Sequence, residues 1–98
     1  MPRPDKILAL HPDPDRQPTN IDRDKYESMK SALLAVIPAE GEGVTFGELD
    51  RLVAPRLPEE LWAGASIQWY VTTVKLDLEA RGLVERVPKS RPQLLLRR

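Results

Sequence analysis

The chain has 98 residues with 15 basic and 15 acidic side chains, and this zero net charge argues against strong indiscriminate attraction to nucleic acids or membranes. It has no cysteine and one histidine, His11, so disulfides and thiolate metal sites are excluded and we expect neither a metal nor a cofactor. No apolar run approaches the roughly 20 residues that cross a bilayer, and the apolar patch at 7–10 is too short for a signal peptide. We therefore expect one small cytoplasmic domain without membrane contact.

The first 21 residues are rich in proline, which excludes a long helix there. The prolines are Pro2, Pro4, Pro12, Pro14 and Pro18. Residues 7–10 favour a short strand, and residues 11–15 favour a turn. We expect residues 1–21 to be an N-terminal arm, ordered only where it docks on a domain formed by residues 22–98.

The first helix is predicted to begin at Asp22, which is a good N-cap, and to continue to about Ile37, where Pro38 ends it. Its apolar side chains recur at helical spacing on one face. They are Tyr26, Met29, Leu33, Val36 and Ile37. A polar, glycine-containing loop at 40–43 follows this helix.

A second, shorter helix follows a β-favouring step at residues 44–46. Thr45 and Glu48 have the spacing of a capping box, in which a hydroxyl and a carboxylate each bind an otherwise unpaired helix amide. We expect this helix to end at Pro55 and to be followed by a single helical turn at 58–62. Its inward side chains are Phe46, Leu49, Leu52 and Val53.

The third and longest helix is predicted over residues 67–81, with Ser66 as its N-cap and Gly82 just after its end. The rest of the chain predicts a hairpin, with its first strand, turn and second strand at 83–87, 88–92 and 93–97. The predicted order is helix, short strand, helix, helix, strand, basic turn and strand, which makes an α+β chain.

Residues 71–86 resemble the third helix and first wing strand of many bacterial winged-helix regulators, and residues 45–49 resemble the start of the second helix in such domains. The shared pattern in the first segment is carried by Leu78, Glu79, Gly82, Leu83 and Val84. This resemblance implies a winged helix, with a three-helix core and a short antiparallel wing hairpin. In winged-helix proteins that bind DNA, the third helix enters the major groove and the wing touches phosphate or the minor groove.

Most of the chain, from about Ile7 to the end, also resembles a family of short bacterial proteins of unknown function. The shared features lie at residues 25–29, 69–70 and 76–84. That family implies a winged-helix fold but no particular activity. One feature departs from a simple helix-turn-helix, because about ten residues separate the second and third helices where three or four are usual.

The predicted helix at 67–81 has three strips when its residues are placed about 100° apart. The core strip is formed by Ile67, Val71, Val74 and Leu78. The polar strip is formed by Gln68, Thr72, Lys75 and Glu79. The third strip lies nearly opposite the core and is formed by Trp69, Leu76 and Ala80, with Thr73 beside them.

The polar strip and the wing point to a DNA-binding or regulatory protein. Gln68, Thr72 and Lys75 carry groups that bond base edges or phosphate. Residues 83–98 hold five basic residues against one acidic residue, a difference of +4, and the turn places Lys89 and Arg91 where cations suit phosphate. A solvated, solubilising C-terminal end explains the same charge, so both interpretations stay open.

The third strip favours a protein partner instead of DNA. Trp69, Thr73 and Leu76 prefer an apolar surface, which a second copy of the chain, another protein or the arm would supply. Alternatively, Trp69 is simply part of the core. No glycine-rich phosphate loop, nucleophile elbow or paired catalytic carboxylates stand out, so we expect no enzyme and name no catalytic residue.

Overall fold

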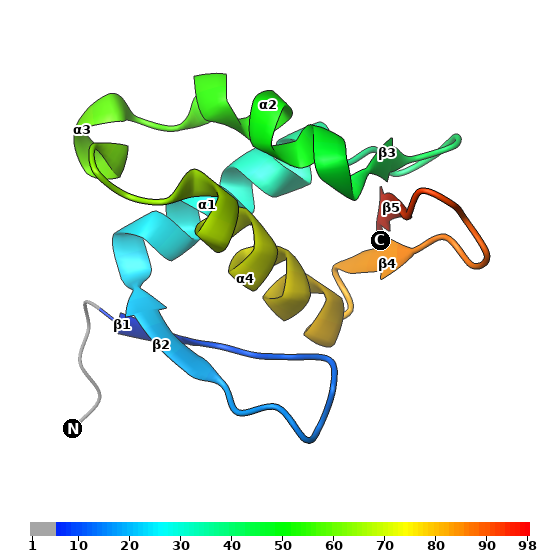
Figure 1. Ribbon diagram of the computed structural model, residues 1–98, viewed down its shortest axis with the longest axis horizontal. Coiled ribbons are helices and arrows are strands. Elements are labelled where there is room, and N and C mark those ends of the chain that lie inside the picture. Colours follow the sequence, from blue (N-terminus) through cyan, green and yellow to red (C-terminus); the bar gives the residue numbers. More distant parts are fainter. Residues whose placement is uncertain (1–5) are drawn as a thin grey trace.

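The computed structural model describes residues 6–98, which form a mixed α+β fold of four α-helices and two small antiparallel sheets (Figure 1). The helices are α1 (Arg23–Val36), α2 (Leu49–Val53), α3 (Glu59–Trp62) and α4 (Ile67–Ala80). The strands are β1 (Lys6–Ala9), β2 (Thr19–Asp22), β3 (Val44–Thr45), β4 (Val84–Arg86) and β5 (Leu94–Arg97). Two short 3-10 helices, η1 (Phe46–Glu48) and η2 (Ala54–Arg56), flank α2.

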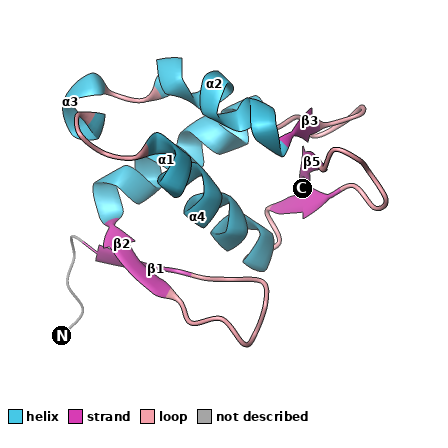
Figure 2. Ribbon diagram, viewed as in Figure 1, coloured by secondary structure: helices cyan, strands magenta, loops and turns pink. Residues whose placement is uncertain are grey.

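An N-terminal hairpin of β1 and β2 lies along one side of the helices (Figure 2). β1 confirms the short strand expected near residues 7–10. The sequence does not predict β2, because Asn20 and Asp22 belong to residue types that are depleted in strands. Ala9 and Ile21 of this hairpin are buried in the same core as the helices, so the described part of the arm is docked.

The first helix, α1, begins where the Asp22 carboxylate accepts a 3.0 Å hydrogen bond from the backbone N–H of Lys25, which confirms Asp22 as the N-cap. The helix ends at Val36, one residue before the predicted end. Pro38, which follows the C-cap residue Ile37, cannot continue the helix.

The predicted second helix is divided into η1, α2 and η2. The Glu48 carboxylate accepts hydrogen bonds from the backbone N–H and the hydroxyl of Thr45, at 3.0 and 2.9 Å. These bonds, the backbone one first, lower the pKa of Glu48 below its ordinary value. Leu49 and Val53 are buried as predicted. Pro55 lies in η2 and has no N–H to extend the α-helical ladder, which explains why α2 stops.

The second sheet has the strand order β3-β5-β4, so the last strand lies between the other two. Val44 pairs with Leu95, and Val84 pairs with Arg97. The predicted hairpin near the C-terminus is therefore confirmed, with strands shorter than expected. Gly43 precedes β3 at φ +91°, and a Cβ atom there would lie 2.6 Å from the Leu95 carbonyl oxygen, so this close approach requires glycine.

The core is centred on the contact between α1 and α4, with α2 and β5 closing its sides (Figure 1). Its largest fully buried apolar side chains are Tyr26, Met29, Leu33, Ile37, Leu49, Val53, Val71, Val74, Leu78 and Leu95. After α4, Gly82 takes φ +77° and the Leu83 N–H donates to the Leu78 carbonyl at 2.9 Å. This is the glycine C-cap that the sequence predicts, and it redirects the chain into β4.

Candidate interface on helix α4 and the β4–β5 hairpin

Helix α4 has a buried face and an open face. Its N-cap is Ser66, whose hydroxyl accepts a 3.2 Å hydrogen bond from the Trp69 N–H, as the sequence predicts. Val71, Val74 and Leu78 are fully buried against the core, which confirms most of the predicted core strip, whereas Ile67 is only partly buried. The open face consists of Gln68, Trp69, Thr72 and Thr73.

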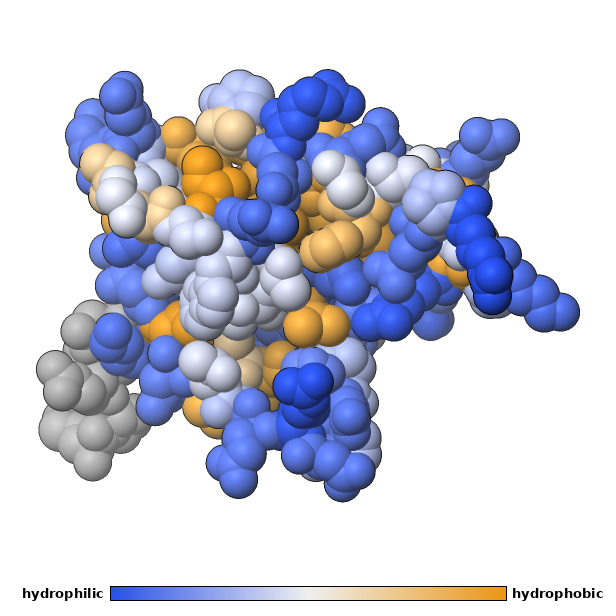
Figure 3. Space-filling model, in the orientation of Figure 1, coloured by the Kyte–Doolittle hydropathy of each residue, from blue (hydrophilic) through white to orange (hydrophobic). Residues whose placement is uncertain are grey.

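The open face holds a shallow depression of about 360 Å³, bounded by its four residues and by Ser66. None of these side chains is charged. The Thr72 hydroxyl donates to the Gln68 carbonyl at 3.0 Å, which leaves the hydroxyl oxygen able to accept another bond. Figure 3 looks onto this side of the molecule and shows a pale region of intermediate hydropathy near its centre, bordered by both hydrophobic (orange) and hydrophilic (blue) surface.

Trp69 lies on the open face with 46% of its surface exposed. Its ring meets Tyr70 edge to face, with ring centroids 4.9 Å apart, and Tyr70 in turn meets Trp62 at 4.9 Å. The alternative that Trp69 is a core residue is therefore wrong. The described part of the arm does not bury Trp69 either, since almost half of the surface of this residue remains exposed.

Lys75 does not belong to the open face, although the sequence places it on the polar strip of α4 with Gln68 and Thr72. The side chain is buried, with only 4% of the residue exposed. Its ammonium group lies 3.1 Å from the Glu79 carboxylate and 4.9 Å from the centre of the Phe46 ring. Burial lowers the pKa of Lys75, and the hydrogen bond to Glu79 partly offsets this effect. The helical wheel places Lys75 in the polar strip, but Phe46 of η1 packs against this side chain in the folded chain.

The side of α4 opposite Lys75 carries a buried carboxylate that sequence reasoning missed. Asp77 is fully buried and accepts hydrogen bonds from the Tyr26 hydroxyl at 2.5 Å, the Leu10 N–H at 2.8 Å and the Arg81 guanidinium at 2.9 Å. The pKa of Tyr26 is raised well above its ordinary value, first by burial and then by the bond to Asp77. The Arg81 guanidinium also donates to the Leu8 carbonyl at 3.1 Å, so the pair holds the N-terminal hairpin against α1 and α4.

The hydrogen bonds of Asp77 and Arg81 show where the N-terminal arm docks on the helices. Its strand β1 contacts the Asp77 side of α4, and Ala9 is buried there. Leu8 points away and is 45% exposed. Docking therefore combines hydrogen bonds of the Leu8 and Leu10 backbone with burial of the Ala9 and Ile21 side chains. The only sequence signal for the site is the i,i+4 spacing of Asp77 and Arg81, which is also common on solvated helix faces.

The tip of the β4–β5 hairpin carries Lys89 and Arg91, and both side chains are exposed. Within the described chain neither makes an ion pair. Ser90 between them shapes the turn, because its hydroxyl donates to the Val87 carbonyl at 2.8 Å and accepts from the Leu94 N–H at 2.9 Å. Lys89 has φ +63°, a left-handed conformation that side chains other than glycine rarely adopt.

The remaining basic residues near the C-terminus have partners within the fold. Arg86 pairs with Glu79, Arg98 pairs with Glu85 at 3.3 Å, and the Arg97 guanidinium donates to the Ile37 carbonyl at 3.4 Å. Of the five basic residues counted in this segment, only the two at the hairpin tip remain unengaged. The cationic surface of the hairpin is therefore smaller than the sequence count of +4 implies.

Among residues 6–98, no group of three or more histidine, aspartate or glutamate side chains is arranged to hold a metal ion. No helix in that range has both the length and the apolar character needed to cross a membrane.

Residues 6–95 match the model of a family of unknown function, DUF6958. Searches of curated proteins and of solved structures gave no match. Because the family model covers nearly the whole described chain, the protein belongs to the DUF6958 family.

Proposed function

We propose that the chain is a winged-helix module that binds double-stranded DNA, with α4 as the recognition helix and the β4–β5 hairpin as the wing. The order of elements supports the fold: α1, β3, α2 and α4 are followed by a hairpin that pairs with β3 in the order β3-β5-β4. The β1–β2 hairpin and the short helix α3 are additions to that plan.

The observation that carries the proposal is the uncharged open face at the start of α4. The exposed cations Lys89 and Arg91, at the tip of the hairpin that follows the other end of α4, support it. Gln68 carries an amide that matches the donor and acceptor pattern of adenine in the major groove. Thr72 has a free acceptor position for a base donor or a bound water. Lys89 and Arg91 would then contact phosphate.

Lys75 has no place in this proposed surface, since it is buried and paired with Glu79. The electrostatic contribution to DNA affinity therefore comes from Lys89 and Arg91 of the proposed wing. Two phosphate contacts predict a slope of about −2 when the logarithm of the binding constant is plotted against that of salt concentration. The chain would bind DNA weakly unless the open face reads a preferred sequence.

The experiment is a titration of the backbone amide signals of the protein with mixed-sequence duplex DNA at low and moderate salt. The proposal predicts shifts confined to the open face and the wing tip, at Gln68, Trp69, Thr72, Lys89 and Arg91, which weaken as salt rises. No shifts at low salt, or shifts centred on the β1–β2 hairpin, would refute it.

A second candidate is a protein-contact module that uses Trp69, Thr73 and Leu76. The observation in its favour is the exposed Trp69 ring on a face without charge. Leu76 is only partly exposed, so Trp69 would be the main anchor. Sedimentation of the wild type and of Trp69→Glu tests the homodimer. A wild-type monomer at high concentration would exclude it, and a wild-type dimer that Trp69→Glu dissociates would support it.

A further inference from the structure

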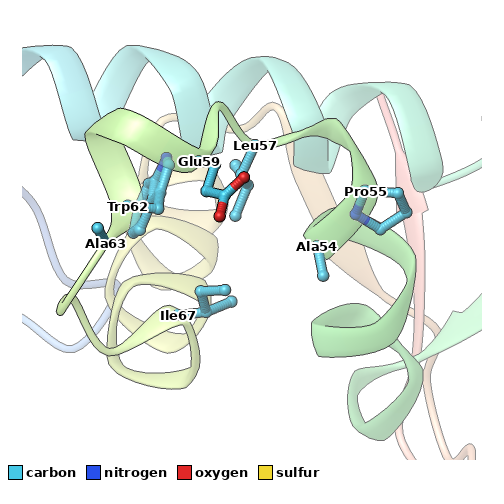
Figure 4. Close-up of a pocket in the computed structure, with 7 residues that line it drawn as sticks. All are labelled: Ala54, Pro55, Leu57, Glu59, Trp62, Ala63 and Ile67. Carbon is cyan, nitrogen blue, oxygen red and sulfur yellow. The ribbon is translucent and has the colours of Figure 1, made fainter.

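A second hollow lies on the other side of the start of α4, between η2, α3 and the first turn of α4 (Figure 4). Its volume is about 390 Å³, which is within the range of small-molecule sites. We call it the α3 groove, and it is lined mainly by Ala54, Leu57, Glu59, Trp62, Ala63 and Ile67. It exists because the chain inserts α3 where a simple helix-turn-helix has a short turn.

The lining of the α3 groove is apolar except for one carboxylate. In Figure 4, Glu59 stands beside Leu57 and Trp62, and Ile67 and Ala54 lie across an open space from them. Within residues 6–98 the Glu59 carboxylate makes no ion pair, and no basic side chain lines the groove. Glu60, next to it, is a second exposed acid but does not line the groove.

Trp62 forms a rigid aromatic wall of this groove. Its indole N–H donates to the Ser28 hydroxyl at 3.1 Å, and its ring meets Tyr70 edge to face. The ring position is therefore held from two sides. An aromatic ring beside a lone carboxylate, among aliphatic groups, suits a positive charge carried on an apolar body.

We infer that the α3 groove binds a small organic cation, an amine or quaternary ammonium group attached to an apolar body. The cationic head lies between the Glu59 carboxylate and the Trp62 ring, and the apolar body lies against Leu57, Ala54 and Ile67. An anion of the same size is disfavoured, because Glu59 and Glu60 both repel it.

The α3 groove also includes the first turn of α4, the helix that carries the proposed DNA contacts. A cation bound in the groove could therefore change DNA binding by α4. Ile67 lines the groove and is the first residue of α4, directly before Gln68 of the open face. Trp62, Tyr70 and Trp69 form a continuous series of ring contacts from the groove to that face. This regulatory part rests on the proposed function, whereas binding in the groove does not.

The direct test measures binding to the protein without DNA. In the Trp69→Phe variant, Trp62 is the only tryptophan, so its fluorescence reports on the groove alone. The probe is benzyltrimethylammonium, with benzyl alcohol as a neutral comparison and benzoate as an anionic one. We expect saturable binding of the cation, about tenfold tighter than of the alcohol, and no saturation by benzoate.

Two substitutions form a matched pair, because each removes one negative charge from an exposed, adjacent position of α3. Glu59→Gln is expected to weaken binding of the cation about threefold to fivefold, whereas Glu60→Gln changes it less than twofold. Ala63→Phe, which fills the groove, should abolish binding without any charge change. Equal affinities for cation and alcohol, or equal effects of the two glutamine variants, would overturn the assignment.

The regulatory part is tested by repeating the DNA titration of the wild type with saturating benzyltrimethylammonium, with tetramethylammonium at the same concentration as a salt control. A change of DNA affinity of at least threefold beyond the control supports regulation, and an unchanged affinity overturns it. A saturable groove in a protein that fails to bind DNA would refute the proposed function and leave the groove assignment standing.

Discussion

The two halves of α4 use their polar residues in opposite ways. In the N-terminal half, Gln68, Thr72 and Thr73 are uncharged and line the open face. In the C-terminal half, Lys75 and Asp77 are charged, buried and engaged with neighbouring elements. The charged groups thus hold the fold together, and the uncharged groups are left for contacts with other molecules.

This division reverses the usual expectation that charged residues mark the solvated face of a helix. The C-terminal half is enclosed by the N-terminal hairpin on one side and by η1 and β4 on the other, so its charges must be paired. No described element covers the N-terminal half to the same extent. Changes in the two halves should therefore separate stability from binding.

The largest expected effect is that of Asp77→Ala, which leaves the Tyr26 hydroxyl, the Leu10 N–H and the Arg81 guanidinium without their shared acceptor. Removing one partner from such a buried group predicts a loss of about 3–5 kcal/mol in the free energy of unfolding, measured by urea denaturation. Asp24→Ala, at an exposed site in the first turn of α1, is the control and should cost less than about 1 kcal/mol. A loss at Asp77 no larger than at Asp24 would contradict the role of Asp77 as an anchor.

The next largest effect is a loss of unfolding free energy at alkaline pH, caused by the burial of Tyr26 and its contact with Asp77. The pKa of Tyr26 is raised in the folded state above its ordinary value of 10.0, so the folded chain holds a proton that the unfolded chain releases. This stabilisation is fully present below pH 10 and is lost as pH rises further, by up to about 1.4 kcal/mol per pH unit. Tyr26→Phe cannot titrate, so the difference in unfolding free energy between wild type and variant should shrink from pH 9.5 to pH 11. If this difference in unfolding free energy stays constant with pH, the pKa of Tyr26 is the same in the folded and the unfolded chain.

A smaller effect is expected at the tip of the β4–β5 hairpin, and it concerns the DNA affinity that the proposed function predicts rather than stability. Replacing Lys89 and Arg91 together by alanine should weaken DNA binding about tenfold at low salt and bring the salt slope from about −2 to near zero. Arg16→Ala, an exposed cation in the loop of the N-terminal hairpin, is the control for a general loss of charge. An equal effect at Arg16 would mean that binding is not localised to the β4–β5 hairpin.

The smallest effect is expected for Lys75→Met, which sharpens the contrast between the two halves of α4. Because Lys75 is buried and Glu79 keeps Arg86 as a partner, DNA affinity should remain within about twofold of the wild type. Methionine also fills similar volume beside Phe46, so the unfolding free energy should change by less than about 2 kcal/mol. A clear loss of DNA affinity with unchanged stability would restore Lys75 to the binding surface.

The residues of the candidate surface were only partly predictable from the sequence. The wheel placed Gln68 and Thr72 outside correctly, because both lie far from the core strip of α4. It failed for Lys75, since a wheel describes one helix and contains no information about the elements that pack beside it. It also gave no warning of Asp77, whose partners Tyr26 and Leu10 lie 51 and 67 residues away in the chain.

Short segments of the sequence were enough to predict most of the local elements. Caps, prolines and glycines such as Asp22, Ser66, Pro38 and Gly82 act over a few residues, so helix limits and the C-terminal hairpin follow from short segments. The pairing of β2 with β1, the burial of the α4 charges and the position of the α3 groove became visible only in the folded chain. Those outcomes depend on contacts between distant segments, whose energies no local pattern encodes.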